Sequence, residues 1–170
     1  MHYQNTRLTQ STFRTGCNFF ASVLAVVFFG CASDVFAAVK SWDGSSGANW
    51  STAANWTPSG APVDGDDLIF PAGAFNLINT NNLTDLRLGS ITFNGASAAY
   101  SLRGNAITIS NGVIAAHTAG DNDLNFTAIT NAASQTYTVD SGGTLDVNAN
   151  VVLIGGFTLT VNNDFTTRFD

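Results

Sequence analysis

The stretch Ile107-Thr108-Ile109-Ser110-Asn111-Gly112-Val113-Ile114 poses the central question about the fold of this chain. Apolar and polar residues alternate before Asn111-Gly112, and a period of two is that of a β-strand with one buried face. Asn-Gly is the strongest short-range signal for a tight hairpin, which would belong to an antiparallel sandwich. The same pair accepts positive φ and also suits the corner between two strands of a parallel β-solenoid. The stretch predicts β-structure and leaves the direction of strand pairing open.

The alternation recurs through the rest of the chain, and no segment after Ala38 keeps a helical period. The predicted strands are short and unevenly spaced, which favours coils with variable corners, whereas the Asn-Gly signal favours hairpins. Thr often separates the apolar residues, and a β-branched hydroxyl residue suits the solvated side of a strand. The alternating segments are Leu86–Leu88, Ile91–Phe93, Ile107–Ile109, Leu124–Phe126, Tyr137–Val139, Leu145–Val147 and Phe157–Val161. Predicted turns between them include Asn94-Gly95, Asn111-Gly112, Asp121-Asn122 and Ser141-Gly142-Gly143.

The composition is acidic and poor in charge. The 170 residues carry 12 acidic side chains, all of them Asp, and 6 basic ones, for a net charge of −6. Phosphate binding needs a basic surface, so this balance argues against a nucleic-acid partner. Asn, Thr, Ser and Gly supply most of the polar surface, and these residues favour strands and turns over helices.

Residues 1–37 have the order of a secretory signal peptide. Arg7 and Arg14 precede an apolar stretch from Phe19 to Ala32, and Val35-Phe36-Ala37 forms a small-x-small cleavage pattern. The apolar stretch is shorter than the roughly 20 residues of a membrane span, so we predict cleavage after Ala37.

Two alternatives to this cleavage are an uncleaved anchoring helix and a lipoprotein site at Gly30-Cys31. Both cysteines of the chain, Cys17 and Cys31, fall within the leader. The mature chain is therefore expected to have no disulfide and to depend on core burial and backbone pairing.

All three tryptophans, Trp42, Trp50 and Trp56, fall within fifteen residues just after the leader. Indole faces stack on sugar rings, so one hypothesis is carbohydrate binding. The favoured hypothesis is a hydrophobic cap over the open end of the first coil, with Asn before each of the last two rings as the turn-former.

Two further groups are candidates for chemistry. Asp64, Asp66 and Asp67 could offer carboxylates to calcium, but the chain has no Glu and no complete EF-hand spacing, so a turn leading into Leu68–Phe70 is favoured. His117 is the only histidine after the leader, and no Gly-x-Ser-x-Gly elbow accompanies it, so we expect it at a corner.

The order of several motifs resembles that of a known family. The motifs are the run from Trp42 through Asn55-Trp56 and Pro62 to Asp66-Asp67 and Leu68–Phe70, then Ile91–Gly95, Tyr100–Asn105, Ile107–Ile109, Asn111-Gly112, Thr136–Val139 and Phe157–Val161. In this order the chain resembles exported bacterial proteins with autotransporter-associated β-strand repeats, in the N-terminal part of the passenger region. The resemblance implies a right-handed parallel β-helix, and the antiparallel β-sandwich that the Asn111-Gly112 signal favours stays the alternative. It also implies display at or beyond the outer membrane of a Gram-negative bacterium. The family has no common catalytic residues to assign.

We therefore expect an exported, non-enzymatic structural segment of the cell surface, with adhesion as an additional role. The alternatives are a carbohydrate-binding module that uses Trp42, Trp50 and Trp56, and a polysaccharide-degrading β-helix enzyme. No catalytic residue, cofactor or metal site is assigned. The expected partners are surface glycans or neighbouring coils of a longer chain, with no nucleic acid, no cytoplasmic partner, and membrane contact through the leader alone.

The expected organisation is a signal peptide at 1–37, a Trp-rich N-terminal cap at 38–70 and β-helix coils at 71–170. Near the end, Phe157–Val161 is a predicted strand, Asn162-Asn163-Asp164 a turn, and Phe165–Phe169 the start of another strand. No polar terminal repeat follows, so we expect the coils to be truncated there and the chain to be a piece of a longer protein.

Overall fold

The computed structural model describes residues 37–140, 142–163 and 167–169. These residues fall within one compact unit, Asp34–Asp170. The predicted leader, apart from Ala37, lies outside the described residues, so the signal peptide and its alternatives stay predictions.

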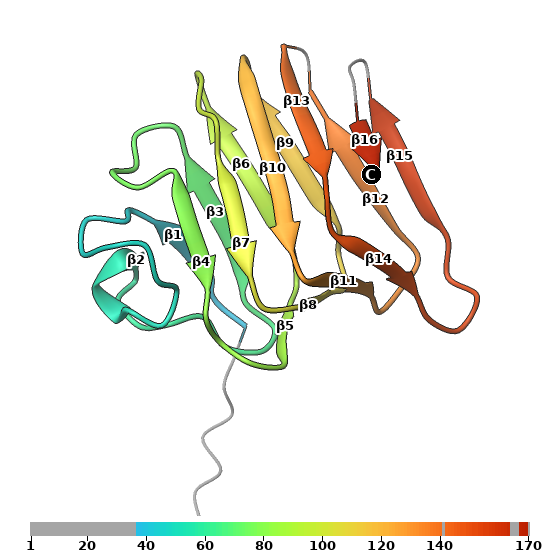
Figure 1. Ribbon diagram of the computed structural model, residues 1–170, viewed down its shortest axis with the longest axis horizontal. Coiled ribbons are helices and arrows are strands. Elements are labelled where there is room, and N and C mark those ends of the chain that lie inside the picture. Colours follow the sequence, from blue (N-terminus) through green and yellow to red (C-terminus); the bar gives the residue numbers. More distant parts are fainter. Residues whose placement is uncertain (1–36, 141, 164–166, 170) are drawn as a thin grey trace, which may run out of the picture. The chain divides into compact units, whose positions relative to one another are not determined.

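The described chain winds around three β-sheets, so that every third strand returns to the same sheet (Figure 1). The first sheet contains β1 (Val39–Trp42), β2 (Trp56–Thr57), β3 (Asp67–Pro71), β6 (Ile91–Gly95), β9 (Val113–His117), β12 (Gln135–Val139) and β15 (Leu159–Asn163). The second contains β4 (Ile78–Asn81), β7 (Ser101–Gly104), β10 (Gly120–Phe126), β13 (Gly143–Val147) and β16 (Thr167–Phe169). The third contains β5 (Leu86–Leu88), β8 (Ile107–Ile109), β11 (Ala128–Asn131) and β14 (Asn150–Leu153). One short 3₁₀ turn, η1 (Ala53–Asn55), is the only helical element of the described residues.

Strands of successive coils pair in parallel. Leu68 of β3 lies beside Ile91 of β6, and Ile91 lies beside Val113 of β9, which are steps of 23 and 22 residues. The result is a β-solenoid of about four turns. The expected all-β fold with parallel pairing is confirmed.

The alternative of an antiparallel sandwich is wrong, and the Asn111-Gly112 corner shows why. The strands on its two sides, β8 and β9, belong to different sheets. The backbone N–H of Asn111 donates to the carbonyl of Gly89, one coil earlier, at 2.7 Å. The corner therefore bonds to the preceding corner, where a hairpin would bond across its own two strands. Among the described strands, antiparallel pairing occurs between β1 and β2.

Several local predictions differ from the structure. Asp121-Asn122, predicted as a turn, lies inside β10, and the predicted turn at Asn162-Asn163 belongs to β15, which begins only at Leu159. The strands β4, β11 and β14 were not predicted. β4 and β11 contain Asn79, Asn81 and Asn131, which look like turn residues in the sequence but are buried in the coils, whereas Asn150 of β14 is exposed.

The core is a continuous stack of side chains that face the inside of the coils. Inward positions alternate with outward ones, as in β5 and β8, where Leu86, Leu88, Ile107 and Ile109 are buried. Aromatic rings of adjacent coils lie on one another, and the centroids of Phe70 and Phe93 are 5.7 Å apart. The core therefore grows coil by coil along the stack.

Some corners bring two backbones too close for a side chain. Gly104, at the end of β7, has φ 106°, and a Cβ there would lie 2.2 Å from the carbonyl oxygen of Asn81 in the coil before. Only glycine avoids both the steric clash and the unfavourable backbone conformation.

We predict that Gly104→Ala lowers the free energy of unfolding by about 2–3 kcal/mol, because strain of this kind costs roughly 1–3 kcal/mol and the contact with Asn81 adds to it. Gly73→Ala is the matched control, since a Cβ at Gly73 meets no atom within 4 Å. Chemical denaturation of both variants checks this. Equal stability of the two variants would contradict the close approach of the coils.

Candidate functional site

The three tryptophans predicted as a cap or a sugar site are buried, with exposed fractions of 0%, 0% and 2% for Trp42, Trp50 and Trp56. Their rings contact one another edge to face, with centroids 4.9 Å apart for Trp42 and Trp56 and 5.8 Å apart for Trp50 and Trp56. All three rings also contact Phe70 of β3. No indole face is left for a sugar ring.

Each indole N–H has a hydrogen-bond acceptor. Trp42 Nε1 donates to the carbonyl of Asn76 at 2.8 Å, and Trp56 Nε1 donates to the carbonyl of Trp50 at 2.9 Å. Trp50 Nε1 donates to Oδ1 of Asn79 in β4 at 2.7 Å. These bonds fix the rings from their polar edges, as buried tryptophans require.

The backbone of the tryptophan segment covers the edges of two sheets. In the first sheet, β2 pairs with β1 and forms the edge. At β4, Thr80 N–H donates to the carbonyl of Ala48 at 2.8 Å, and Trp50 N–H donates to the carbonyl of Thr80 at 3.0 Å. The segment thus satisfies edge strands that would otherwise expose unpaired groups, and the cap hypothesis agrees with this arrangement.

The three clustered aspartates bind backbone and hydroxyl donors at different places. Asp66 is fully buried and accepts from the N–H groups of Ala38 at 2.8 Å and Val63 at 3.0 Å. Asp64 Oδ1 accepts from the N–H of Arg87 at 2.9 Å, and Asp67 Oδ1 from the hydroxyl of Ser90 at 2.7 Å. The carboxylates therefore fasten the loop before β3 to β1 and to the next coil.

His117 closes β9 and is fully buried, although the sequence suggested a corner. Its ring stacks on Tyr100 with centroids 5.9 Å apart and an interplanar angle of 15°. Nε2 lies 2.9 Å from the carbonyl oxygen of Asn94, which can only accept, so Nε2 donates; Nδ1 lies 3.1 Å from the side chain of Asn122. Both ring nitrogens are engaged inside the core.

Tyr100 belongs to the same buried polar group. Its hydroxyl donates to the carbonyl of Pro71 at 2.6 Å, and burial raises the pKa of its phenol above the ordinary value. The phenol is therefore a protonated hydrogen-bond donor at physiological pH. The group of Tyr100, His117 and Asn122 ties three coils together, and the isolated histidine in the sequence gave no signal of it.

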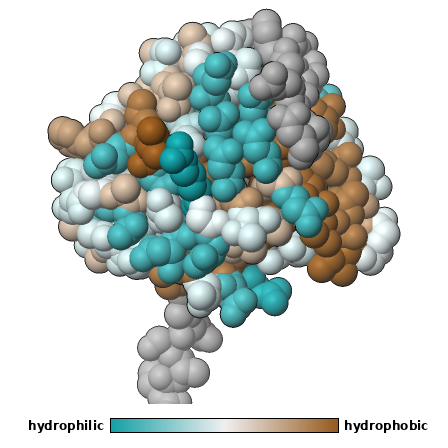
Figure 2. Space-filling view, viewed as in Figure 1, coloured by the Kyte–Doolittle hydropathy of each residue, from teal (hydrophilic) through white to brown (hydrophobic). Residues whose placement is uncertain are grey.

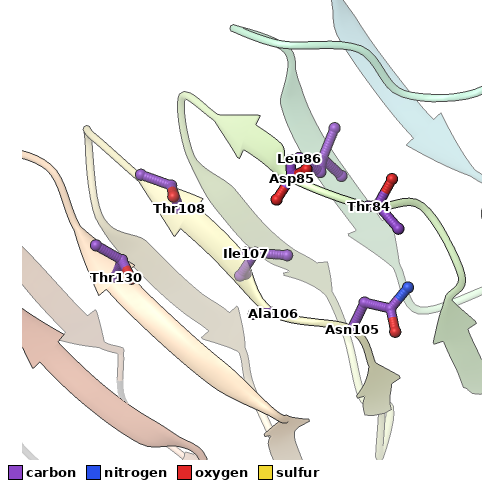
Figure 3. Close-up of a pocket in the computed structure, with 8 residues that line it drawn as sticks. All are labelled: Thr84, Asp85, Leu86, Asn105, Ala106, Ile107, Thr108 and Thr130. Atoms are coloured by element: carbon purple, nitrogen blue, oxygen red, sulfur yellow. The ribbon is translucent and has the colours of Figure 1, made fainter.

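A shallow hollow of about 330 Å³ lies where the second sheet turns into the third. Figure 3 shows that its lining comes from three successive coils: Thr84–Leu86, Asn105–Thr108 and Thr130. Asp85 carries the only ionisable side chain of this lining and has φ 55°, in the left-handed region. One carboxylate among hydroxyl and amide groups does not form an acid–base pair.

Polar side chains bond from one coil to the next along the outside of the solenoid. Asn105 Nδ2 donates to the carbonyl of Leu83, and Asn148 Nδ2 donates to Oδ1 of Asn125, both at 3.0 Å. Further bonds of this kind join Asn125 to Ser101, Thr127 to Gly104 and Thr144 to Asp121. The bonded residues are 22 to 24 positions apart, which is one coil.

Exposed apolar side chains gather on the last described coil. Leu153, Ile154, Phe157 and Val161 have exposed fractions between 36% and 55%. We call this group the C-terminal apolar patch. Figure 2 shows a hydrophobic area on the side of the molecule where the last coils lie.

Within the described residues, no three His, Cys, Asp or Glu side chains gather closely enough to hold a metal ion. No helix in that part of the chain is long and apolar enough to cross a membrane.

We predict that Trp50→Ala lowers the free energy of unfolding by about 3–5 kcal/mol, the cost of truncating a buried aromatic side chain. The matched control is Phe75→Ala, because Phe75 is 80% exposed, and its effect should stay within about 0.5 kcal/mol. Thermal or chemical denaturation measures both. An unchanged melting temperature together with lost binding on a glycan array would contradict the cap and favour sugar stacking.

Comparisons with known proteins supply no identity for this chain: no family model, no curated protein and no solved structure matches it.

Proposed function

We propose that this chain is an exported structural element of the bacterial cell surface, built as a β-solenoid and without catalytic activity. The observation that carries the proposal is the use of its polar side chains. Asn, Ser, Thr and Asp side chains bond mainly to the adjacent coil, and the buried His117 and Asp66 bond to backbone and amide groups. Side chains bonded in this way hold each coil to the next.

Export is supported by the sequence features of residues 1–37 and by the family that the motifs resemble. Residues 38–170 contain no cysteine, so a mature chain cut after Ala37 would be held together by core burial and backbone pairing, without a disulfide. The proposed location is the extracellular space or the outer-membrane surface of a Gram-negative bacterium.

The three tryptophans that the carbohydrate-binding alternative would use are buried, and their indole N–H groups are hydrogen-bonded within the chain. A polysaccharide-degrading enzyme would need a pair of carboxylates, and the hollow of Figure 3 is lined by one, that of Asp85. Neither alternative has an observation in its favour among the described residues.

The partner that we propose is another β-coil. Among the described strands, each of β14, β15 and β16 forms the edge of its sheet, and the C-terminal apolar patch lies on the end of β14, on β15 and on the segment between them. An edge strand beside exposed apolar side chains is a template for parallel or antiparallel strand pairing. Coil-to-coil contact at this surface would extend the same pairing that holds the solenoid.

The first test is export of the full chain from a Gram-negative host. We expect a product outside the cytoplasm that begins at Ala38, as measured by cell fractionation and intact mass. Ala37→Arg is the control, because a large charged residue before the cleavage point should leave the precursor uncut. A cytoplasmic product that retains Met1 would contradict export, and a product acylated at Cys31 would contradict cleavage after Ala37.

The second test is self-association of the exported product in analytical ultracentrifugation. We expect oligomers at tens of micromolar, and a shift toward monomer in a variant that combines Ile154→Lys and Val161→Lys, because charge on an edge blocks strand pairing. Phe75→Lys is the matched control, since Phe75 is exposed but lies outside the patch. A monomeric parent protein, or an equal effect of the control, would contradict this partner.

A further inference from the structure

The start of the solenoid is held by the loop that precedes β3. The backbone N–H of Ala38 donates to Oδ1 of Asp66 at 2.8 Å, and the carbonyl of Ala38 accepts from the N–H of Asp67 at 2.9 Å. Ala38 is half-buried, whereas Ala37 is exposed. Both backbone groups of Ala38 are therefore bound to one short loop.

The acceptor in this contact is a buried carboxylate. Asp66 has an exposed fraction of 0%, and its second oxygen accepts from the N–H of Val63 at 3.0 Å. The ammonium of Lys40 in β1 donates instead to the carbonyl of Pro58 at 3.3 Å. A carboxylate removed from water is costly unless charged or several donors compensate it, and here both donors are neutral amides.

We propose that removal of the leader at the Ala37–Ala38 bond supplies the missing cation, as the new α-ammonium of Ala38 pairs with Asp66. This inference rests on the export proposed above. Hydrolysis adds one water molecule: the new carboxylate leaves with Ala37, and the amine stays on Ala38 and takes up a proton at neutral pH. The nitrogen atom is the one that already lies 2.8 Å from Oδ1. A charge-assisted hydrogen bond is about twice as strong as a neutral one.

The position of the cut matters for this pair. A terminus at Ala37 would place the ammonium one residue further out, on an exposed residue. A terminus at Val39 would remove the residue that contacts both Asp66 and Asp67. Of these three termini, only one that begins at Ala38 places the charge on the nitrogen atom that faces Asp66. The resulting ion pair then holds β1 against β3.

The test compares four exported proteins: the parent, a version with Asn-Thr inserted between Ala37 and Ala38, and Asp66→Asn in each. Intact mass establishes every terminus. We expect the parent to melt about 3–6 °C above the extended version, the shift that a bond of this strength gives in a domain of this size. With Asp66→Asn the difference between the two termini should vanish.

A second measurement keeps Asp66 intact and so does not depend on the folding of Asp66→Asn. The rate of α-amine labelling by an amine-reactive reagent should be at least about tenfold lower in the parent than in the extended version. A mass that includes the leader would overturn both export and the ion pair. If the mass corresponds to a terminus at Ala38, then equal labelling rates, or a melting difference that persists with Asp66→Asn, would overturn the ion pair alone.

Discussion

The solenoid depends on parallel backbone pairing between each coil and the next. Its strands are short, with three residues in β5 and in β8, and strands of this length depend on pairing with neighbouring coils for their stability. The pairing also fixes which side chains meet. Because Leu68, Ile91 and Val113 occupy equivalent positions in successive coils, the inward residues form columns of similar apolar groups. Stability therefore comes from repetition of one contact along the stack.

Polar groups follow the same rule of repetition, both outside and inside the coils. On the outside, Asn125 bridges Ser101 and Asn148, which lie in the coils before and after it. Inside, Asn81 accepts from the N–H of Leu83 and donates to the carbonyl of Asn105, so it fastens a corner to the corner above it. This use of amides is not without cost. Nδ2 of Asn79 and of Asn131 is buried without a hydrogen-bond partner, and such groups usually destabilise a core.

The period-two alternation was enough to predict the all-β fold and most of the strands. Segments such as Ile107–Ile109 carry their burial pattern in their own residues, so local information decides them. The direction of pairing at Asn111-Gly112 depends on a bond to Gly89, one coil away, and no local pattern contains it. The predictions for buried polar residues were wrong for the same reason. Asn122 looks like a turn residue by itself and becomes a core residue only because Tyr100 and His117 lie beside it.

The features that look most functional in the sequence, the tryptophans and the aspartates, both lie at the N-terminal end of the stack. A coil inside a solenoid finds its partners in its neighbours, so its sequence can repeat. Among the described residues no coil precedes the first one, and its edge is paired with the tryptophan segment instead, through β2 and Ala48–Trp50. Trp50 supplies apolar area and an N–H for Asn79, while Asp66 supplies acceptors for Ala38 and Val63. Dense aromatic and acidic clusters at the end of a repeat array are therefore as readily explained by end closure as by a ligand, and burial decides between the two. Here Trp42, Trp50 and Asp66 are each fully buried, and Asp64 and Asp67 bond to Arg87 and Ser90 of the next coil, so these side chains serve the architecture of the first coil.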